Sequence, residues 1–153
     1  MLPALCAGLM LAACADSGAR HLAPPPALSS GALTPGETEV EYGNVRDKVY
    51  FSTDSALLQP DAQQMLQKQA AWLQDFPRHT VTIEGHADER GTREYNLALG
   101  ERRAQAVMDY LIALGIDSKR LKTISYGKER PVCTDANEAC RSQNRRSVST
   151  LDN

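Results

Sequence analysis

The chain has 153 residues, and its formal net charge is −2. This balance argues against a nucleic-acid-binding protein, which usually carries a strongly basic surface, and no apolar run in the sequence is long enough to span a bilayer as a retained helix. Aromatic residues make up only 5% of the chain, so we expect one globular domain with a modest, mainly aliphatic core.

The first segment of the chain is apolar and rich in small residues, and it ends in Leu11-Ala12-Ala13-Cys14. This composition predicts a secretory signal peptide over residues 1–13. The last four residues resemble the bacterial lipobox, in which the cysteine thiol receives a diacylglycerol, so we expect Cys14 to be lipidated. Ala15 rather than an aspartate follows it, which is typical of lipoproteins sorted to the outer membrane. Because no Lys or Arg precedes the apolar run, we expect translation to begin upstream of Met1.

Residues 14–44, which follow the signal, are expected to form a flexible tether. They show almost no apolar periodicity and contain Pro24-Pro25-Pro26, Ser29-Ser30-Gly31 and Pro35-Gly36. A chain of about 28 residues reaches roughly 30 Å on average and at most about 100 Å when extended. This reach suits a protein that is fixed to a membrane and binds something a short distance away.

The globular domain is expected over residues 45–153, where apolar residues alternate as in strands or recur at helical spacing. The predicted elements are a strand over 45–52 with Val49 and Phe51 on one face, a helix from Pro60 to just before Pro77, a strand over 80–85, a helix over 93–114, and strands over 121–127 and 145–151. The inner stripe of the second helix is predicted to be Leu97, Gly100, Ala104, Val107, Leu111 and Leu114. The order β-α-β-α-β-β predicts an α/β (α+β) two-layer sandwich.

Two charged residues near the junction of the second strand and the second helix are the candidate ligand contacts. Asp88 comes just past the strand end, and Arg103 shares a helix stripe with Asn96 and Leu99. A carboxylate can hold an ammonium group, and a guanidinium can hold a carboxylate by two parallel hydrogen bonds. We therefore expect Arg103 to rest on the core edge and to point toward the loop, forming with Asp88 a socket for a zwitterionic centre. Spacing alone favours the alternative, an internal Asp88–Arg103 ion pair that orders the loop.

Four separated segments of the domain carry a resemblance to a known family. They are Val81 to Thr92, Tyr95 to Ala104, Ser125 to Pro131 and Gln143 to Arg146. In order and spacing they resemble OmpA-like peptidoglycan-binding domains, and among these the peptidoglycan-associated lipoproteins of Gram-negative bacteria. The resemblance covers about residues 45–151, and it implies a mixed four-stranded sheet under the helices, with no enzymatic activity, no cofactor and no metal.

The resemblance also assigns roles to individual residues. It implies that Asp88 and Arg103 bind meso-diaminopimelate in the stem peptide of peptidoglycan, and the predicted binding set is completed by Asp54, Thr92, Asn96 and Arg145, the last expected mainly to support the site. Thr53 stands where family members often have phenylalanine, so we expect a weaker apolar wall there. Gly100 replaces a serine inside a helix, where glycine costs about 1 kcal/mol relative to alanine, so we expect close packing at that position.

The function implied by the resemblance is that of a tether. The protein is expected to be an outer-membrane lipoprotein whose domain faces the periplasm and holds the cell wall, as part of the Tol-Pal system in envelope integrity and cell division. TolB and other Tol proteins are the expected protein partners. An alternative stays open, in which the protein is chiefly a hub for Tol proteins and wall binding is secondary.

Three other features of the sequence bear on a metal site, on catalysis and on a disulfide. His79, His86 and Asp88 could suggest a metal site, but no further ligand lies at a suitable spacing. A hydrolase that uses His86 as a base and Asp88 to orient it would lack an obvious nucleophile. Cys133 and Cys140 bracket a short, turn-rich loop, and in an oxidising periplasm we expect them to form a disulfide rather than remain free thiols.

Overall fold

The computed structural model describes residues 47–152 of the chain. Its elements are β1 (Lys48–Tyr50), α1 (Pro60–Asp75), β2 (Thr80–His86), α2 (Arg93–Ala113), the short 3-10 helix η1 (Ser118–Arg120), β3 (Leu121–Gly127), α3 (Glu138–Asn144) and β4 (Arg146–Asp152). The predicted succession of strands and long helices is confirmed. The structure adds η1 and α3, which the sequence pattern did not indicate.

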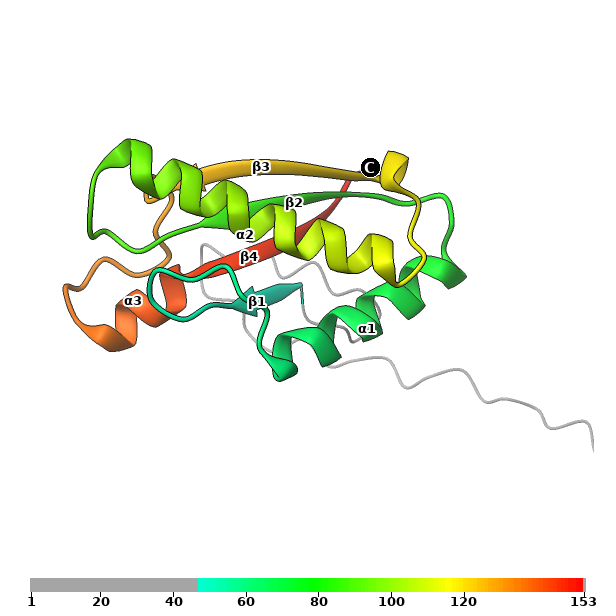
Figure 1. The fold of residues 1–153 in the computed structure, drawn as a ribbon, viewed down its shortest axis with the longest axis horizontal. Coiled ribbons are helices and arrows are strands. Elements are labelled where there is room, and N and C mark those ends of the chain that lie inside the picture. Colours follow the sequence, from blue (N-terminus) through cyan, green and yellow to red (C-terminus); the bar gives the residue numbers. More distant parts are fainter. Residues whose placement is uncertain (1–46, 153) are drawn as a thin grey trace, which may run out of the picture. The chain divides into compact units, whose positions relative to one another are not determined.

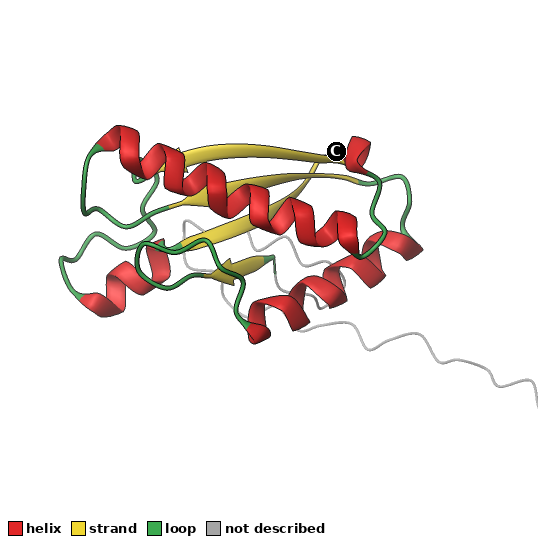
Figure 2. Cartoon of the chain, viewed as in Figure 1, coloured by secondary structure: helices red, strands yellow, loops and turns green. Residues whose placement is uncertain are grey.

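The four strands form one mixed sheet in the order β1-β4-β2-β3. β2 and β3 run parallel, and β4 is antiparallel to both β1 and β2. Two parallel neighbours need a crossover connection, which α2 provides. Helices α1 and α2 pack on one face of the sheet, while α3 lies beside the start of β4 (Figures 1 and 2). The predicted two-layer architecture with a mixed four-stranded sheet is therefore confirmed, and β2 is an inner strand.

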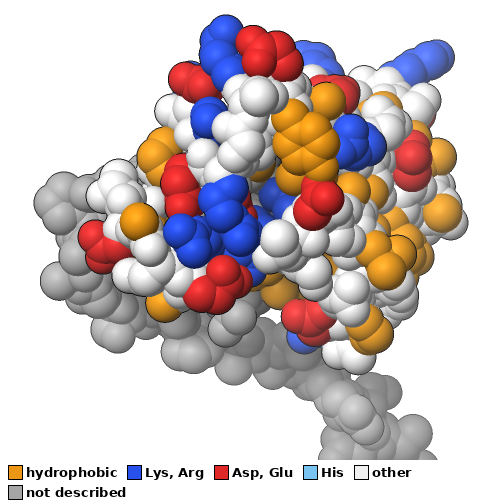
Figure 3. Space-filling view, turned by 60° about the vertical axis from the view of Figure 1, so that its left-hand side comes forward, with side chains coloured by type: hydrophobic (Ala, Val, Ile, Leu, Met, Phe, Trp, Pro, Cys, Tyr) orange, Lys and Arg blue, Asp and Glu red, His pale blue; other side chains and the backbone are white. Residues whose placement is uncertain are grey.

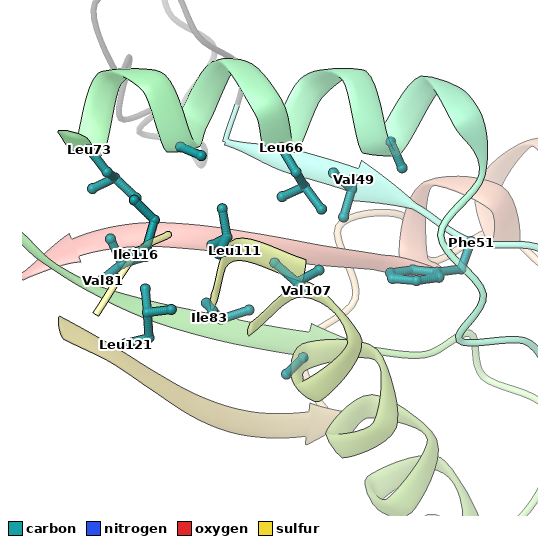
Figure 4. Packing of buried hydrophobic residues seen from close by; sticks show 13 residues of the cluster. Val49, Phe51, Leu66, Leu73, Val81, Ile83, Val107, Leu111, Ile116 and Leu121 are labelled. Atoms are coloured by element: carbon teal, nitrogen blue, oxygen red, sulfur yellow. The ribbon is translucent and has the colours of Figure 1, made fainter. Parts of the chain in front are cut away.

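The core lies between the sheet and the two long helices (Figure 4). Alternate β2 residues Val81 and Ile83 point into it and are fully buried, as the predicted alternation requires. The remaining large members are Val49, Phe51, Leu66, Leu73, Val107, Leu111, Ile116 and Leu121. They are mainly aliphatic, as the composition predicts. None of the helices within residues 47–152 has both the length and the apolarity needed to cross a bilayer.

Three details of the predicted elements were wrong. β1 is shorter than predicted because the chain leaves the sheet after Phe51, whose N–H still reaches the Arg145 carbonyl oxygen at 2.9 Å, and turns at Asp54 with a positive φ of 55°. β4 begins one residue later than predicted, at Arg146. Leu97 was placed on the inner stripe of α2, yet it is 45% exposed while Leu99 is buried.

The buried stripe at the start of α2 consists of Asn96, Leu99, Gly100 and Arg103, so polar groups face the interior there. The predicted close packing at Gly100 is confirmed. A Cβ at Gly85 of β2 would stand 1.8 Å from the Gly100 carbonyl oxygen, and a Cβ at Gly100 would stand 2.3 Å from the Ser125 Oγ. Helix α2 thus packs directly against β2, and this close contact places Arg103 near the end of β2.

Candidate ligand-binding site

A cavity of about 310 Å³ opens at the end of β2, where the chain turns into α2. Its walls come from the turn after β1, the loop after β2 and the first turns of α2. The lining residues are Thr53, Asp54, Asp88, Arg90, Gly91, Tyr95, Asn96, Leu99 and Arg103. Acidic and basic side chains gather at this end of the molecule (Figure 3). Of the predicted binding set, Asp54, Asp88, Asn96 and Arg103 therefore come together in one pocket.

Asp88 is held at the end of β2 by two arginines. The preceding Ala87 N–H donates to the Gly127 carbonyl oxygen at 2.8 Å, which keeps the chain beside β3. The Asp88 carboxylate accepts hydrogen bonds from Arg90 Nη2 at 2.7 Å and from Arg145 Nη1 at 3.4 Å. Burial alone would raise the pKa of Asp88, but the hydrogen bonds and charge of Arg90, with a further bond from Arg145, outweigh it and lower the pKa. Asp88 is therefore a stable anion at neutral pH.

The lowered pKa of Asp88 predicts how its contribution to stability depends on pH. A carboxyl whose pKa is lower in the folded than in the unfolded chain stabilises the fold above the unfolded pKa of about 3.9, and this stabilisation is lost as the pH falls through the folded value. The wild type should therefore exceed Asp88→Asn in unfolding free energy by a constant amount from pH 7 to about pH 5, and the difference should shrink below about pH 4. Urea unfolding of both proteins measures it. A difference that already shrinks between pH 7 and pH 5 would contradict a lowered pKa.

Arg103 is fully buried, and its guanidinium is anchored on the backbone. Nε donates to the Ser55 carbonyl oxygen at 2.8 Å, Nη1 to that of His86 at 2.7 Å and Nη2 to that of Ser52 at 3.1 Å. The guanidinium also lies over the Phe51 ring, with 5.2 Å from Cζ to the centroid. Arg103 therefore joins the turn after β1 to the end of β2, and N–H groups remain on it beyond those used by the carbonyls.

The Arg103 side chain points toward the end of β2, as expected, but it is fully buried rather than placed at the edge of the core. The alternative is wrong, because no carboxylate of residues 47–152 lies within ion-pair distance of Arg103, so the internal Asp88–Arg103 pair is absent. Burial, followed by the positive charge of Arg145, lowers the pKa of Arg103 to about 10, so it stays charged at neutral pH. A buried cation that has no anion in direct contact favours an anionic group of a ligand.

Asn96 and Thr92 order the loop between β2 and α2 by hydrogen bonds. Asn96 Nδ2 donates to the Arg90 carbonyl oxygen at 2.7 Å and to that of Thr92 at 2.9 Å, while its Oδ1 accepts no hydrogen bond from the described part of the chain. That oxygen is available to a ligand. Thr92 is the N-cap of α2, and its Oγ1 accepts from the Tyr95 N–H at 3.2 Å. Thr92 therefore lies outside the pocket wall, where the structure gives it a capping role.

The turn after β1 supplies the opposite wall. Asp54 accepts a hydrogen bond from the Tyr95 hydroxyl, which joins this turn to α2. Thr53 Oγ1 lies 3.4 Å from Arg90 Nη2, so the wall is polar where the resemblance implies phenylalanine. Leu99 and the ring of Tyr95 provide the apolar part of the pocket.

Arg145 lies behind Asp88 and does not line this cavity. Its Nε donates to the Phe51 carbonyl oxygen at 3.1 Å, and its Nη2 donates to Glu138 Oε1 at 2.6 Å. Arg90 is the site residue that the sequence argument missed. Arg90 could have been predicted from its position two residues after Asp88. At that spacing both the backbone N–H and the side chain of an arginine can donate hydrogen bonds to the carboxylate.

The cysteine predictions have different outcomes. The predicted disulfide is confirmed, since Cys133 and Cys140 are bonded with their Cα atoms 5.2 Å apart. The first half of the turn-rich loop that they bracket has no regular structure, and its second half forms the first turn of α3. Cys14, the predicted lipidation site, lies outside the described residues, as do the predicted signal peptide and tether.

The geometry is unsuited to the metal and hydrolase alternatives. His86 is 1% exposed, its Nε2 lies 3.4 Å from Glu84 Oε2, and its ring packs against Tyr126 with 5.5 Å between the centroids. Burial, with the charges of Arg146 and Arg130, lowers the pKa of His86 to about 3, so it is a very weak base. Residues 47–152 contain no group of at least three acidic, histidine or cysteine side chains that could hold a metal ion.

The fold is an α/β domain that has a mixed sheet, helices on one face and a charged pocket at the end of an inner strand. Comparison with known proteins identifies its class. The family model of the OmpA family matches residues 50–145. The peptidoglycan-associated lipoprotein of Brucella melitensis is 55% identical over 125 residues, which cover 82% of this chain and 74% of that protein. The corresponding lipoprotein of Mesorhizobium japonicum is 50% identical over 149 residues, which cover 97% and 89%.

A solved structure agrees with these relatives. The crystal structure of the peptidoglycan-associated lipoprotein from Burkholderia pseudomallei matches with a TM-score of 0.69 and 42% identity, covering 70% of this chain and 91% of that one. The chain therefore belongs to the OmpA family, and its relatives there are peptidoglycan-associated lipoproteins. The names of these relatives describe association with peptidoglycan and a lipid anchor and state no enzymatic activity.

Proposed function

We propose that this protein is a lipoprotein of the outer membrane whose domain binds peptidoglycan non-covalently. In this proposal the zwitterionic end of meso-diaminopimelate, in the stem peptide, enters the pocket at the end of β2. The observation that carries the proposal is that the anion Asp88 and the buried cation Arg103 line one cavity without pairing with each other. Such an arrangement suits a ligand that carries both charges on one centre.

Each charge of the ligand has a partner of the right chemistry. Asp88 would accept the ammonium, and the remaining N–H groups of Arg103 would donate to the carboxylate. Arg90 Nη2 donates to Asp88 Oδ2 at 2.7 Å. The Arg90 side chain is 43% exposed, so it can move into solvent when the ammonium of the ligand replaces it at the carboxylate. Asn96 Oδ1 is a further acceptor for the ammonium.

The choice between diaminopimelate and lysine tests this proposal. The two differ by one carboxylate at the end of the side chain. In a stem peptide whose C-terminus is amidated, lysine offers only its ε-ammonium to the pocket, so Arg103 stays unpaired, whereas diaminopimelate offers an ammonium and a carboxylate on one carbon. The diaminopimelate stem peptide should therefore release the domain from purified sacculi at concentrations at least roughly tenfold lower than the same peptide with L-lysine, since one charge-assisted interaction contributes about 1.5–3 kcal/mol. Co-sedimentation with increasing competitor measures this. Failure of the domain to pellet with sacculi, or equal competition by both peptides, would contradict the proposed site.

The membrane anchor and the protein partners complete the proposal. The Leu-Ala-Ala-Cys14 sequence and the relatives' description as lipoproteins support a lipid on Cys14, with the domain facing the periplasm. Metabolic labelling of the wild type and Cys14→Ser with palmitate tests the anchor. Partnership with TolB and other Tol proteins of the Tol-Pal system rests on the family alone. Capture of purified TolB by the immobilised domain tests it, and absence of capture would count against a hub role.

A further inference from the structure

The segment between β3 and β4 is held by a disulfide and by hydrogen bonds from both ends of its helix. Its helix, α3, has seven residues, which is too short to be stable in isolation. The Cys133–Cys140 disulfide fastens the helix to the preceding chain, and Asn137 caps it by accepting from the Cys140 N–H at 2.8 Å. At the other end, Asn144 Oδ1 accepts from the Val132 N–H at 2.8 Å and its Nδ2 donates to the Cys133 carbonyl oxygen at 2.7 Å.

This unit contacts the loop that carries Asp88. Glu138 and Arg141 stand three residues apart on α3 and so share a face of the helix. Arg141 Nε donates to Glu89 Oε1 at 2.8 Å. Glu138 Oε1 accepts from Arg145 Nη2 at 2.6 Å, and Arg145 Nη1 in turn reaches Asp88 at 3.4 Å. Glu89 is therefore bonded to Arg141 of α3, and Asp88 is bonded to Arg145, the residue that follows α3.

The distances indicate what Glu138 does for Asp88. Arg145 is nearer to Glu138 than to Asp88, so Glu138 limits how closely the Arg145 guanidinium approaches the Asp88 carboxylate, whose nearer partner is the exposed Arg90. The hydrogen bond from Arg145 lowers the pKa of Glu138, and that from Arg141 lowers the pKa of Glu89, so both pairs are charged at neutral pH. Without Glu138, Arg145 would close on Asp88 and compete with the ammonium of a ligand.

We propose that the disulfide-closed segment 133–145 is a positioning device for the binding loop, in which Glu138 and Arg141 are positioning residues. The inference rests on the proposed function, because it concerns the affinity of the same pocket. Cys140 and Asn144 are the buried residues of α3, so little apolar packing holds the helix in place. The disulfide holds α3 in place instead. Reducing it loosens the contacts to Asp88 and Glu89, while the rest of the domain stays folded.

Reversible reduction tests the disulfide. A dithiol reductant is oxidised to its own disulfide and supplies two electrons and two protons, the Cys133–Cys140 S–S bond breaks, and two thiols form. Reduction of the full chain should weaken binding to sacculi by roughly tenfold, and reoxidation should restore it, because several ion pairs loosen together. The matched control is the double variant Cys133→Ser/Cys140→Ser, which should bind as weakly with or without reductant. Circular dichroism at 25 °C checks that the domain remains folded, so reduced global stability does not account for the change.

Two outcomes are decisive for the disulfide. If the wild type, with both thiols shown by titration to be free, binds as tightly as the oxidised protein, the positioning role of the disulfide is overturned. If the oxidised wild type does not bind sacculi, the proposed function itself fails, which is a separate result.

Variants that keep the disulfide test the two positioning residues. Glu138→Gln and Arg141→Gln should each weaken binding up to roughly fivefold, the range of a partly exposed ion pair. Arg141→Lys should restore part of the loss, because it keeps the charge opposite Glu89. Arg78→Gln is the control for a changed surface charge, since Arg78 is exposed and precedes β2 at the strand end away from Asp88. Wild-type affinity in both glutamine variants would overturn their positioning role.

Discussion

Asp88→Asn is expected to weaken binding of the domain to purified sacculi by roughly 100-fold, since removing one partner of a buried, hydrogen-bonded charge pair costs about 2–5 kcal/mol. Asparagine has almost the same shape as aspartate, and its oxygen can still accept from the Arg90 N–H, now at 3.2 Å from Oδ1. The negative charge, however, is lost, and with it the attraction for an ammonium group. The effect should therefore fall on binding much more than on folding.

Co-sedimentation over a range of sacculus concentrations measures this effect. Asp75→Asn is the matched control, because it removes an exposed carboxylate at the C-terminal end of α1 and should bind like the wild type. If Asp88→Asn pellets as fully as the control, Asp88 is not the ammonium partner. If wall binding is lost while TolB capture persists, Tol proteins use a different surface, which would favour the hub alternative as an additional function.

Arg103→Ala is expected to lower the unfolding free energy by about 3–5 kcal/mol, besides abolishing wall binding. The alanine variant leaves the carbonyl oxygens of Ser52, Ser55 and His86 without their donor in a buried place. It also removes the group that packs on Phe51 and joins the turn after β1 to the end of β2. Loss of binding in this variant alone would therefore not distinguish a ligand contact from a collapsed pocket.

Arg103→Lys separates the two effects. Lysine keeps the positive charge and can bond one or two of the carbonyls, so we expect a smaller loss of stability, but it lacks the planar fork that holds a carboxylate by two bonds. Urea unfolding gives the stability of each variant, and co-sedimentation well below the unfolding midpoint gives the affinity. A wild-type unfolding midpoint for Arg103→Ala would contradict the anchoring contacts. Wild-type affinity for Arg103→Lys would contradict bidentate recognition.

The regular elements could be predicted from the sequence because they follow from periodicity. Val81 and Ile83 alternate with polar residues in β2, and both are fully buried. The segment that forms α3 has no such pattern. Its order comes from a disulfide, a cap by Asn137 and the side chain of Asn144, contacts that depend on chain segments brought together by the fold. Leu97 was misplaced for a related reason, since the start of α2 packs over the ends of strands and loops, where the buried face is polar.

The sequence by itself determined the family, the order of the main elements, and the pocket residues Asp88, Arg103, Asn96 and Asp54. Only the tertiary structure decided how the charges pair. Arginine side chains are long, and several of them reach the end of β2, so spacing cannot show which one meets a given carboxylate. The close contact of Gly85 with Gly100 draws Arg103 inward onto backbone carbonyls, while Arg90 and Arg145 reach Asp88. The two charges therefore face one cavity as separate groups, because each is already held by other partners.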